Sequence, residues 1–261
     1  MTDRTKAAED IARKGGALAL NYFAKLGSLE VEDKGPQDFV TEADKNVETH
    51  VRELIGRAFP DDGIVGEEHA PKPSQTGYTW VIDPIDGTAN FVSAIPAWCV
   101  VIAIVKDDRA QTGVIYDPIH DEMFAAERGR GAHLNGAPLV CPPDTALNRG
   151  SVGTGYSSRI SVDQTIKVVR AVLEKGGVFH RNASGALSLA YVSAGRLIGY
   201  IEEHMNAWDC LAGQLLIAEA GGRAEDQSAT TMIADGGRVV AGSKGVFDDL
   251  VRIADDIFPA K

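Results

Sequence analysis

The sequence has few of the residues on which disulfide frameworks, zinc sites and membrane spans depend. Its 261 residues include three cysteines, Cys99, Cys141 and Cys210, which lie far apart and show no C-x-x-C spacing. An odd number of scattered cysteines fits no disulfide framework and predicts reduced, mostly buried thiols. The longest apolar run, residues 94–105, is far shorter than the roughly 20 residues of a membrane-spanning helix, and the start of the chain lacks the apolar segment of a signal peptide. We therefore expect a cytoplasmic protein without membrane association.

Positive charge is also scarce. The chain has 26 Lys and Arg against 37 Asp and Glu, which gives a formal charge of −11, and no run of basic residues is longer than two. A field of this sign repels phosphate backbones and anionic lipids, so we expect no direct nucleic-acid binding. An anionic substrate would need positive charge from outside the chain, and a metal ion is the obvious source. Hydrophobic residues make up 44% of the chain and charged residues 24%, which is typical of a globular protein.

The first half of the chain predicts two helices followed by a sheet. Residues 4–25 place apolar side chains on one helical stripe. A second helix is expected from Thr41, with Asp44 three residues later as in a capping box, to Phe59. The period then changes to short β-rich runs separated by turns, which predicts an antiparallel meander. These runs are residues 64–65, 79–83, 100–105, 111–116, 123–126 and 132–134.

The second half predicts layered α/β structure. Strands near residues 151–154, 178–180 and 197–201 alternate with helical patterns at 161–175, 184–194 and 208–220. The irregular segment between Val140 and Asn148 is the best candidate for a boundary. We therefore expect an N-terminal lobe of residues 1–145 and a C-terminal lobe of residues 146–261.

The sharpest local feature is the segment WVIDPIDGTANF at residues 80–91. Asp83 ends an apolar run, a proline follows, and Asp86 comes three residues after the first carboxylate. Because proline fixes φ and donates no hydrogen bond, the two carboxylates are held in a rigid turn where they can share cations. Gly87 allows close approach of the backbone, and the N–H groups of Gly87 and Thr88 can face an anion if a helix starts there. The same dipeptides also form ordinary turns, so the pattern alone leaves a plain turn open.

Three further acidic segments each have a plain structural interpretation. Glu67 and Glu68 follow an apolar pair and fit a solvated strand edge. Asp209 opens an expected helix and fits an N-cap residue. The segment from Lys34 to Asp44 fits a loop that leads into a capped helix. The EF-hand, P-loop, G-x-S-x-G and H-E-x-x-H motifs are absent from the sequence.

Taken together and in this order, the four segments resemble the inositol monophosphatase family. The marks of that family are K-x-x-x-D-x-V-T-x-x-D, G-E-E, D-P-[IL]-D-G-T-x-N-F and W-D-x-x-A-G. They correspond here to residues 34–44, 66–68, 83–91 and 208–213, so the likeness covers nearly the whole chain. The resemblance implies an α/β fold, a five-layered α-β-α-β-α sandwich of the inositol monophosphatase and fructose-1,6-bisphosphatase type, with the active site between the two lobes.

The resemblance also implies a site for two to three Mg²⁺ ions. Glu67, Asp83 and the carbonyl of Ile85 would hold one ion, while Asp83, Asp86 and Asp209 would hold a second. A weaker third ion would lie near Glu67. Paired Mg²⁺ ions prefer oxygen ligands and can clamp both sides of an in-line displacement.

By the same resemblance, the reaction is the hydrolysis of a small polyol or sugar monophosphate by a metal-activated water, with lithium as an inhibitor. Thr88, hydrogen bonded to Asp44, and Glu67 would position that water. The amides of Gly87 and Thr88 would bind the phosphoryl oxygens.

The residues that the resemblance assigns to substrate binding come from both lobes. They are Ile85, Asp86, Gly87, Thr88, Ala183, Ser184, Gly185, Glu202 and Asp209. Glu202 would accept a substrate hydroxyl. The family's G-[ST]-A is here Ala183-Ser184-Gly185, and residues 203–206 also depart from the family pattern. The expected substrate is myo-inositol monophosphate, with histidinol phosphate, fructose 1,6-bisphosphate and 3′-phosphoadenosine 5′-phosphate as alternatives.

Two further expectations concern partners, and both rest on the resemblance alone. The first is a homodimer. The second is a regulatory role, because some bacterial relatives act by contacting transcription or RNA-processing machinery, and that role needs no intact metal site. All the motif acids are present here, which favours catalysis.

Overall fold

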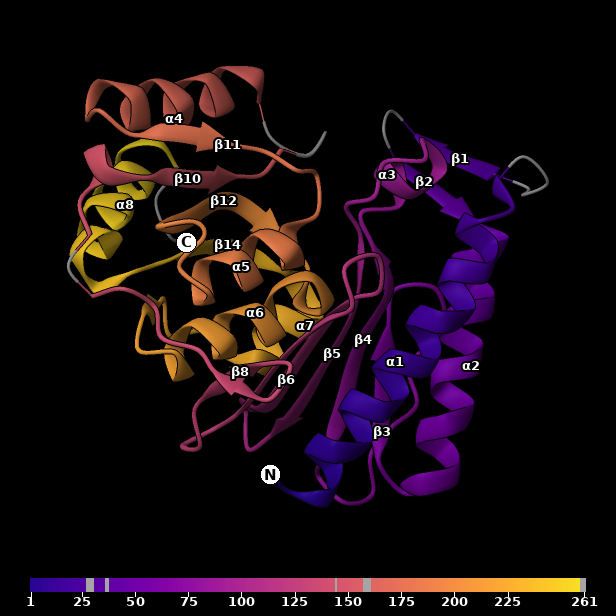
Figure 1. Cartoon of the computed structure of the whole chain (residues 1–261). Coiled ribbons are helices and arrows are strands. Elements are labelled where there is room, and N and C mark those ends of the chain that lie inside the picture. The colour runs from indigo at the N-terminus through magenta and orange to yellow at the C-terminus, as the bar shows by residue number, and fades with distance from the viewer. Residues whose placement is uncertain (27–30, 36–37, 144, 157–160, 259–261) are drawn as a thin grey trace.

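The chain folds into five alternating layers of helices and sheets (Figure 1). This computed structural model describes residues 1–26, 31–35, 38–143, 145–156 and 161–258, and it gives only the backbone of residues 31–35 and 38–40. No helix in these ranges is long and apolar enough to cross a membrane. The three cysteines are unpaired and buried, as the sequence predicts.

Two helices form the first layer. They are α1 (Asp3–Phe23) and α2 (Glu42–Ala58). Their apolar sides pack on one face of the first sheet in a core that includes Val47, Val51 and Ile55. Thr41 and Asp44 form the capping box expected from the sequence, because the Thr41 hydroxyl accepts from the Asp44 amide and the Asp44 carboxylate accepts from the Thr41 amide. Both helix predictions are confirmed to within about two residues.

The second layer is a seven-stranded sheet with strand order β3-β4-β5-β6-β7-β8-β9. Its strands are β3 (Gly63–Gly66), β4 (Thr79–Asp86), β5 (Cys99–Lys106), β6 (Arg109–Asp117), β7 (Glu122–Glu127), β8 (Ala132–Leu134) and β9 (Ala137–Pro138). The predicted strands are confirmed, but the predicted all-antiparallel meander is wrong at one edge. β3 pairs with β4 in parallel, since the connection at residues 67–78 is long enough to return the chain to the same end.

The third layer lies between the two sheets. It contains α5 (Gly185–Ser193), α6 (Ala207–Glu219) and α7 (Ala229–Asp235). Residues of α5 and α6 are buried nearly all round, and together with inward side chains of both sheets they form the largest core cluster of the described residues. A helix apolar on every side is expected where it is covered by a sheet on both faces.

The fourth and fifth layers belong to the second half of the chain. The five-stranded sheet has the order β11-β10-β12-β14-β13. Its strands are β10 (Ser151–Thr154), β11 (Val178–His180), β12 (Gly199–Met205), β13 (Arg223–Ala224) and β14 (Gly237–Gly242). The helices α4 (Val162–Glu174) and α8 (Lys244–Ile257) cover its outer face.

Smaller elements complete the described chain. They are the hairpin of β1 (Val31–Gly35) and β2 (Asp38–Thr41), the short helix α3 (Thr88–Val92) and the 3₁₀ turn η2 (Leu147–Arg149). The first sheet is made of residues 63–138 and the second of residues 151–242. The division of the chain into lobes at residue 145 stays a prediction about folding units.

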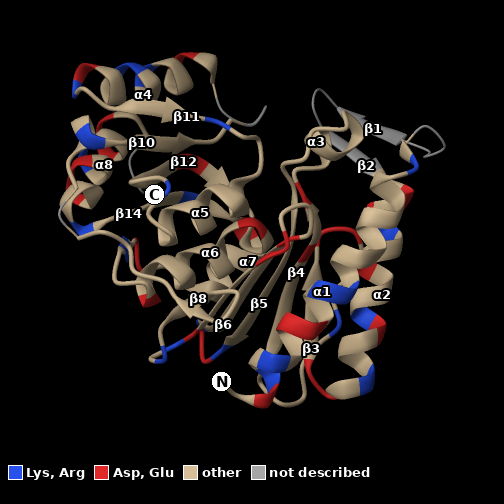
Figure 2. Cartoon of the chain, in the orientation of Figure 1, with Lys and Arg blue, Asp and Glu red and all other residues tan. Residues whose placement is uncertain are grey.

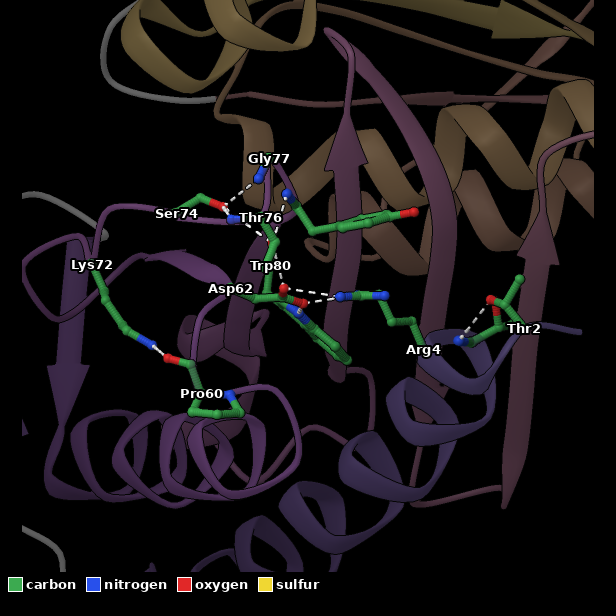
Figure 3. Close-up of polar contacts among 11 residues, drawn as sticks. Thr2, Arg4, Pro60, Asp62, Lys72, Ser74, Thr76, Gly77 and Trp80 are labelled. Carbon is green, nitrogen blue, oxygen red and sulfur yellow. Dashed lines mark hydrogen bonds and ion pairs between the residues drawn. The ribbon is translucent and has the colours of Figure 1, made fainter.

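A buried polar cluster fixes the start of β4 at the end opposite Asp86 (Figure 3). Asp62 is almost fully buried and accepts hydrogen bonds from Arg4 (2.8 and 3.0 Å), from the Thr76 hydroxyl (2.5 Å) and from the Trp80 indole (2.9 Å). Burial alone would raise the pKa of Asp62, but these donors outweigh it and the pKa is lowered overall. The cluster therefore ties α1 to the beginning of the strand that carries Asp83 and Asp86.

Candidate functional site

Two aspartates project from the last residues of β4. Asp83 is 2% exposed, and its Oδ1 accepts a hydrogen bond from the Ile85 amide at 2.9 Å. The expectation that the strand ends at Asp83 is wrong: β4 continues to Asp86, with an irregularity between the two aspartates in its pairing with β5. A bulge of this kind redirects side chains, and it allows two acids three residues apart to serve one site.

A third aspartate comes from the other half of the chain. Asp209 is the third residue of α6, and its Oδ2 accepts from the Asn206 amide at 3.1 Å, so Asn206, not Asp209, is the N-cap. Carboxylate oxygens of Asp83, Asp86 and Asp209 all lie within 4.8 Å of one another. Figure 2 shows acidic segments where β4 faces α6, at the junction of the two sheets.

The pKa values of these three carboxyls are all raised. Burial is the main cause at each of them. Repulsion from Glu67, Asp86 and Asp209 raises the pKa of Asp83 further, and repulsion from Asp86 contributes to raising that of Asp209 to about 8. Carboxylates crowded in this way favour a bound cation, which relieves the repulsion.

The donor set fits a hard divalent cation. Mg²⁺ takes oxygen ligands and commonly uses few carboxylates while keeping several waters. Three aspartates at this spacing can therefore hold a metal ion. Asp86 is held in place by the Ser184 hydroxyl (2.5 Å) and the Ala186 amide (2.8 Å), both of which donate to its Oδ2. These bonds also link β4 to the start of α5.

Glu67 lies beside this group but is not one of its three members. The parallel pairing of Gly66 with Ile82 brings Glu67, the next residue, alongside Asp83. Its charge raises the pKa of Asp83, while its own side chain is exposed. The position fits the predicted role of Glu67 as a ligand, with Asp83, of one metal ion, and that role stays a prediction.

Thr88 and Asp44 form a second polar pair next to the aspartates. The Thr88 hydroxyl lies 3.2 Å from Asp44 Oδ1 and 3.1 Å from the Ile85 carbonyl, and it can donate to either. Asp44 is buried, which raises its pKa to about 6, although hydrogen bonds from Thr41 oppose the shift. The contact between Thr88 and Asp44 that the resemblance implies is present.

Gly87 is the N-cap of α3 and has φ 100°, in the region that favours glycine. A Cβ at this position would lie 2.9 Å from the Ala97 carbonyl oxygen. As the N-cap and the first residue of α3, Gly87 and Thr88 present amides that have no acceptor within the helix. These amides are the predicted phosphoryl contacts.

The C-terminal half forms a pocket beside Asp86 and Asp209. Ala183, Ser184, Gly185 and Glu202 line it, and their assignment to substrate binding stays a prediction. Several further lining residues were not predicted from the sequence, namely Thr154, Gly155, Tyr156, Arg181, Asn182, Ser188, Tyr200 and Met205. No local pattern marks them, because they come together only through the packing of β10, β12 and α5. Lys34 lies in β1, where the structure describes only the backbone.

Glu202 is fixed by a buried neighbour on the same strand. The Tyr200 hydroxyl donates to Glu202 Oε2 at 2.5 Å, and Tyr200 is 2% exposed. The two carboxylate oxygens of Glu202 lie within 2.4 Å of where a Cβ on Gly155 would be, so the carboxylate packs directly on that glycine. Glu202 thus has a defined position at the pocket wall.

Comparison with known proteins gives the same family as the motifs. Residues 1–256 match the Inositol monophosphatase family. The chain belongs to the inositol monophosphatase family. It is 34% identical over 244 residues to "Nus factor SuhB" of Haemophilus influenzae, which covers 92% of this chain and 91% of the relative. It is 34% identical over 251 residues to "Inositol-1-monophosphatase" of Rhizobium meliloti, covering 95% and 94%.

Solved structures agree with the fold. The extragenic suppressor protein suhB of Bartonella henselae superposes with a TM-score of 0.90 at 30% identity and covers 97% of this chain and 98% of that one. The five-layered inositol monophosphatase fold is therefore confirmed. Members of this family use metal ions, and the aspartate group described above is where this chain could bind one.

Ala183 stands in a strained backbone conformation where the family motif has glycine. Its φ is 60°, in the left-handed region, which costs an L-residue roughly 1 to 2 kcal/mol. We expect Ala183→Gly to raise the free energy of unfolding by about 0.5 to 1 kcal/mol, because the relief of strain exceeds the added entropy of the unfolded chain. Urea denaturation measures this change. Ala194→Gly is the control, since Ala194 has φ −87° and should lose stability. An unchanged or lower value for Ala183→Gly would contradict the assignment of strain.

The acidic site also predicts how the metal-free protein responds to pH. The pKa of Asp44 is raised to about 6 and that of Asp209 to about 8, so their protonated forms favour folding and this stability is lost as pH rises through those values. In EDTA, Tm should fall from pH 5.5 to pH 9. Mg²⁺ should raise Tm most at high pH, because it binds the ionised carboxylates.

The control compares two aspartate variants in the same assay. Asp209→Asn should flatten the fall in Tm near pH 8, whereas Asp226→Asn, at an exposed residue that pairs with Arg109, should not. A metal-free Tm that stays constant or rises between pH 6 and pH 9 would show that ionisation of these carboxyls does not destabilise the folded protein.

Proposed function

We propose that this chain is a Mg²⁺-dependent phosphomonoesterase that hydrolyses a small polyol or sugar monophosphate, with myo-inositol monophosphate as the first candidate. The observation that carries the proposal is the convergence of Asp83, Asp86 and Asp209 within 4.8 Å, next to the pair of Thr88 and Asp44. Family membership and the relative named inositol-1-monophosphatase support the same activity.

Asp83, Asp86 and Asp209 would hold the metal ions, together with Glu67 and the carbonyl of Ile85. When bound, Mg²⁺ supplies positive charge for the phosphoryl oxygens and makes a coordinated water more acidic. This role answers the question raised by a net charge of −11, because the protein can bind an anionic substrate once cations occupy its acidic site.

Thr88 would orient the attacking water. Its hydroxyl hydrogen points to Asp44 Oδ1 or to the Ile85 carbonyl, so an oxygen lone pair of Thr88 remains to accept a hydrogen bond from the water. A proton taken up at Thr88 Oγ1 can pass on to Asp44, whose pKa of about 6 leaves it mostly ionised at neutral pH. The amides of Gly87 and Thr88 would hold the phosphoryl oxygens during the displacement.

The pocket supports a polar substrate. Glu202, fixed by the Tyr200 hydroxyl, can accept hydrogen bonds from hydroxyl groups of a polyol. Ala183, Ser184 and Gly185 line the same pocket as Asp86, and the Ser184 hydroxyl donates to the Asp86 carboxylate. These features favour an inositol phosphate.

One lining residue favours a substrate with a second anionic group. Arg181 is exposed at the pocket and brings a positive charge there. A guanidinium suits a second phosphate, as in fructose 1,6-bisphosphate or 3′-phosphoadenosine 5′-phosphate. The substrate test therefore includes both of these compounds, and histidinol phosphate as a monophosphate with an amine.

The test of the proposal is phosphate release from this panel with and without Mg²⁺. We expect turnover that depends on the metal and is highest for inositol 1-phosphate. Asp86→Asn should lower kcat/KM by at least about 100-fold, because it removes a charged ligand, whereas the exposed Asp226→Asn should leave it unchanged. Near-normal turnover of Asp86→Asn would overturn the ligand assignment, and turnover in EDTA would overturn the metal dependence.

A second candidate function is binding to transcription machinery. It is favoured by relatives named Nus factor SuhB, among them that of Escherichia coli K12, which is 36% identical over 238 residues. A binding role predicts that the chain co-purifies with transcription proteins of its host and that Asp83→Asn does not weaken this association. No co-purification of the unaltered chain, or its loss in Asp83→Asn, would argue against a binding role independent of the site.

A further inference from the structure

One face of α2 contacts two parts of the site, the Thr88 hydroxyl and the segment that follows Glu67. Asp44, Glu48 and Arg52 are spaced four residues apart, so their side chains lie on one stripe of the helix. Asp44 contacts the Thr88 hydroxyl, as described above. Glu48 and Arg52 instead face the segment that carries Glu67.

Glu48 is fully buried, and its carboxylate accepts three hydrogen bonds. The amides of Glu68 (2.7 Å) and His69 (3.2 Å) donate to it, and so does Arg52 Nε (2.7 Å). Three hydrogen bonds to a buried carboxylate hold it firmly in place. It fixes the backbone of the two residues directly after Glu67.

Arg52 holds the same segment through its carbonyl groups. Its Nη2 donates to the His69 carbonyl at 3.0 Å and its Nη1 to the Ala70 carbonyl at 3.1 Å. The guanidinium thus bridges Glu48 and two consecutive carbonyls in a planar arrangement that lysine cannot reproduce. The His69 ring adds a contact to the Lys45 carbonyl at 3.1 Å.

The segment also lies against α2 too closely to allow a side chain at Gly66. A Cβ on Gly66 would stand 2.3 Å from Glu48 Oε1. On the other side, Gly66 pairs with Ile82 in the parallel ladder of β3 and β4. Glu67 is therefore placed between two fixed supports, the strand that bears Asp83 and the stripe on α2.

We propose that Glu48 and Arg52 are positioning residues that hold Glu67 against Asp83 for metal binding. Through them α2 acts as one rigid support, which fixes the place of Glu67 relative to Thr88 and Asp44. The inference rests on the proposed function, in which Glu67 is a metal ligand. Removing a residue that holds a metal ligand in place commonly changes metal affinity by about 10- to 100-fold.

The experiment measures Mg²⁺ binding to the metal-free full-length protein by isothermal titration calorimetry, without substrate. In Glu48→Gln, the side-chain amide sets its own N–H groups against the donors of Glu68, His69 and Arg52. We expect the Kd for Mg²⁺ to rise about 10-fold or more, with KM for substrate at saturating Mg²⁺ nearly unchanged. The matched control is Glu53→Gln on the same helix, which loses an exposed i,i+4 pair with Arg57 and should leave Kd unchanged.

Arg52→Lys keeps the charge and loses the planar bridge, so it should raise Kd by about 3- to 10-fold and remains informative if Glu48→Gln fails to fold. A Kd for Mg²⁺ within about twofold of that of the unaltered protein, in either folded variant and even with a lowered Tm, would overturn the positioning role and leave a purely structural one.

Asp86→Asn distinguishes a failure of the proposed function from a failure of the positioning role. If the unaltered protein binds no Mg²⁺, or Asp86→Asn binds it normally, the proposed function fails. If the unaltered protein binds Mg²⁺, Asp86→Asn binds it weakly, and the Glu48 and Arg52 variants keep the Kd of the unaltered protein, the positioning role alone fails.

Discussion

Repulsion among three carboxylates held within 4.8 Å is the constraint on which the rest of this structure depends. Burial raises the pKa values of all three acids, and repulsion raises those of Asp83 and Asp209 further, so their ionised forms destabilise the folded chain. The fold keeps them together because it holds each one by other groups. The Ile85 amide binds Asp83, Ser184 and the Ala186 amide bind Asp86, and the Asn206 amide binds Asp209. A bound cation would relieve this repulsion, so the acids that oppose folding when ionised are also the groups that could hold a metal ion.

The layers of the fold bring these acids together from distant parts of the chain. β4 contributes two aspartates from the first sheet, and α6, which lies between the sheets, contributes the third. Asn90 strengthens the junction, because its side-chain amide donates to the carbonyl of Asn182, a pocket-lining residue, at 2.6 Å. On the other side, α2 supports both Thr88 and the Glu67 segment. The site is therefore a meeting point of rigid elements, and the metal would link the two halves of the chain at that point.

Part of this could be predicted from the sequence, and the reasons differ from element to element. The capping box at Thr41 and Asp44 and the apolar run before Asp83 are local signals, so α2 and β4 were predicted close to their observed places. The parallel pairing of β3 with β4 depends on the path of a long connection, which no local pattern shows. The meeting of Asp209 with Asp83 followed only from the resemblance to a family. Arg181 and Tyr200 gave no signal because they reach the pocket through tertiary packing. Two other signals are local. Glu48 follows Asp44 by four residues, which places both on one face of α2, and the apolar periodicity of residues 244–257 is typical of a helix, observed as α8.

The central claim is that Asp83 and Asp86 of β4 and Asp209 of α6 form one divalent-cation site. The most direct measurement is an anomalous difference map from crystals grown with Mn²⁺, an ion of similar ligand preference that scatters anomalously. The account predicts a strong peak at bonding distance from oxygens of all three aspartates, and the loss of this peak in Asp209→Asn. The account would be contradicted if Mn²⁺ fully occupied another position and no peak appeared among these aspartates, while the protein released phosphate in the same buffer.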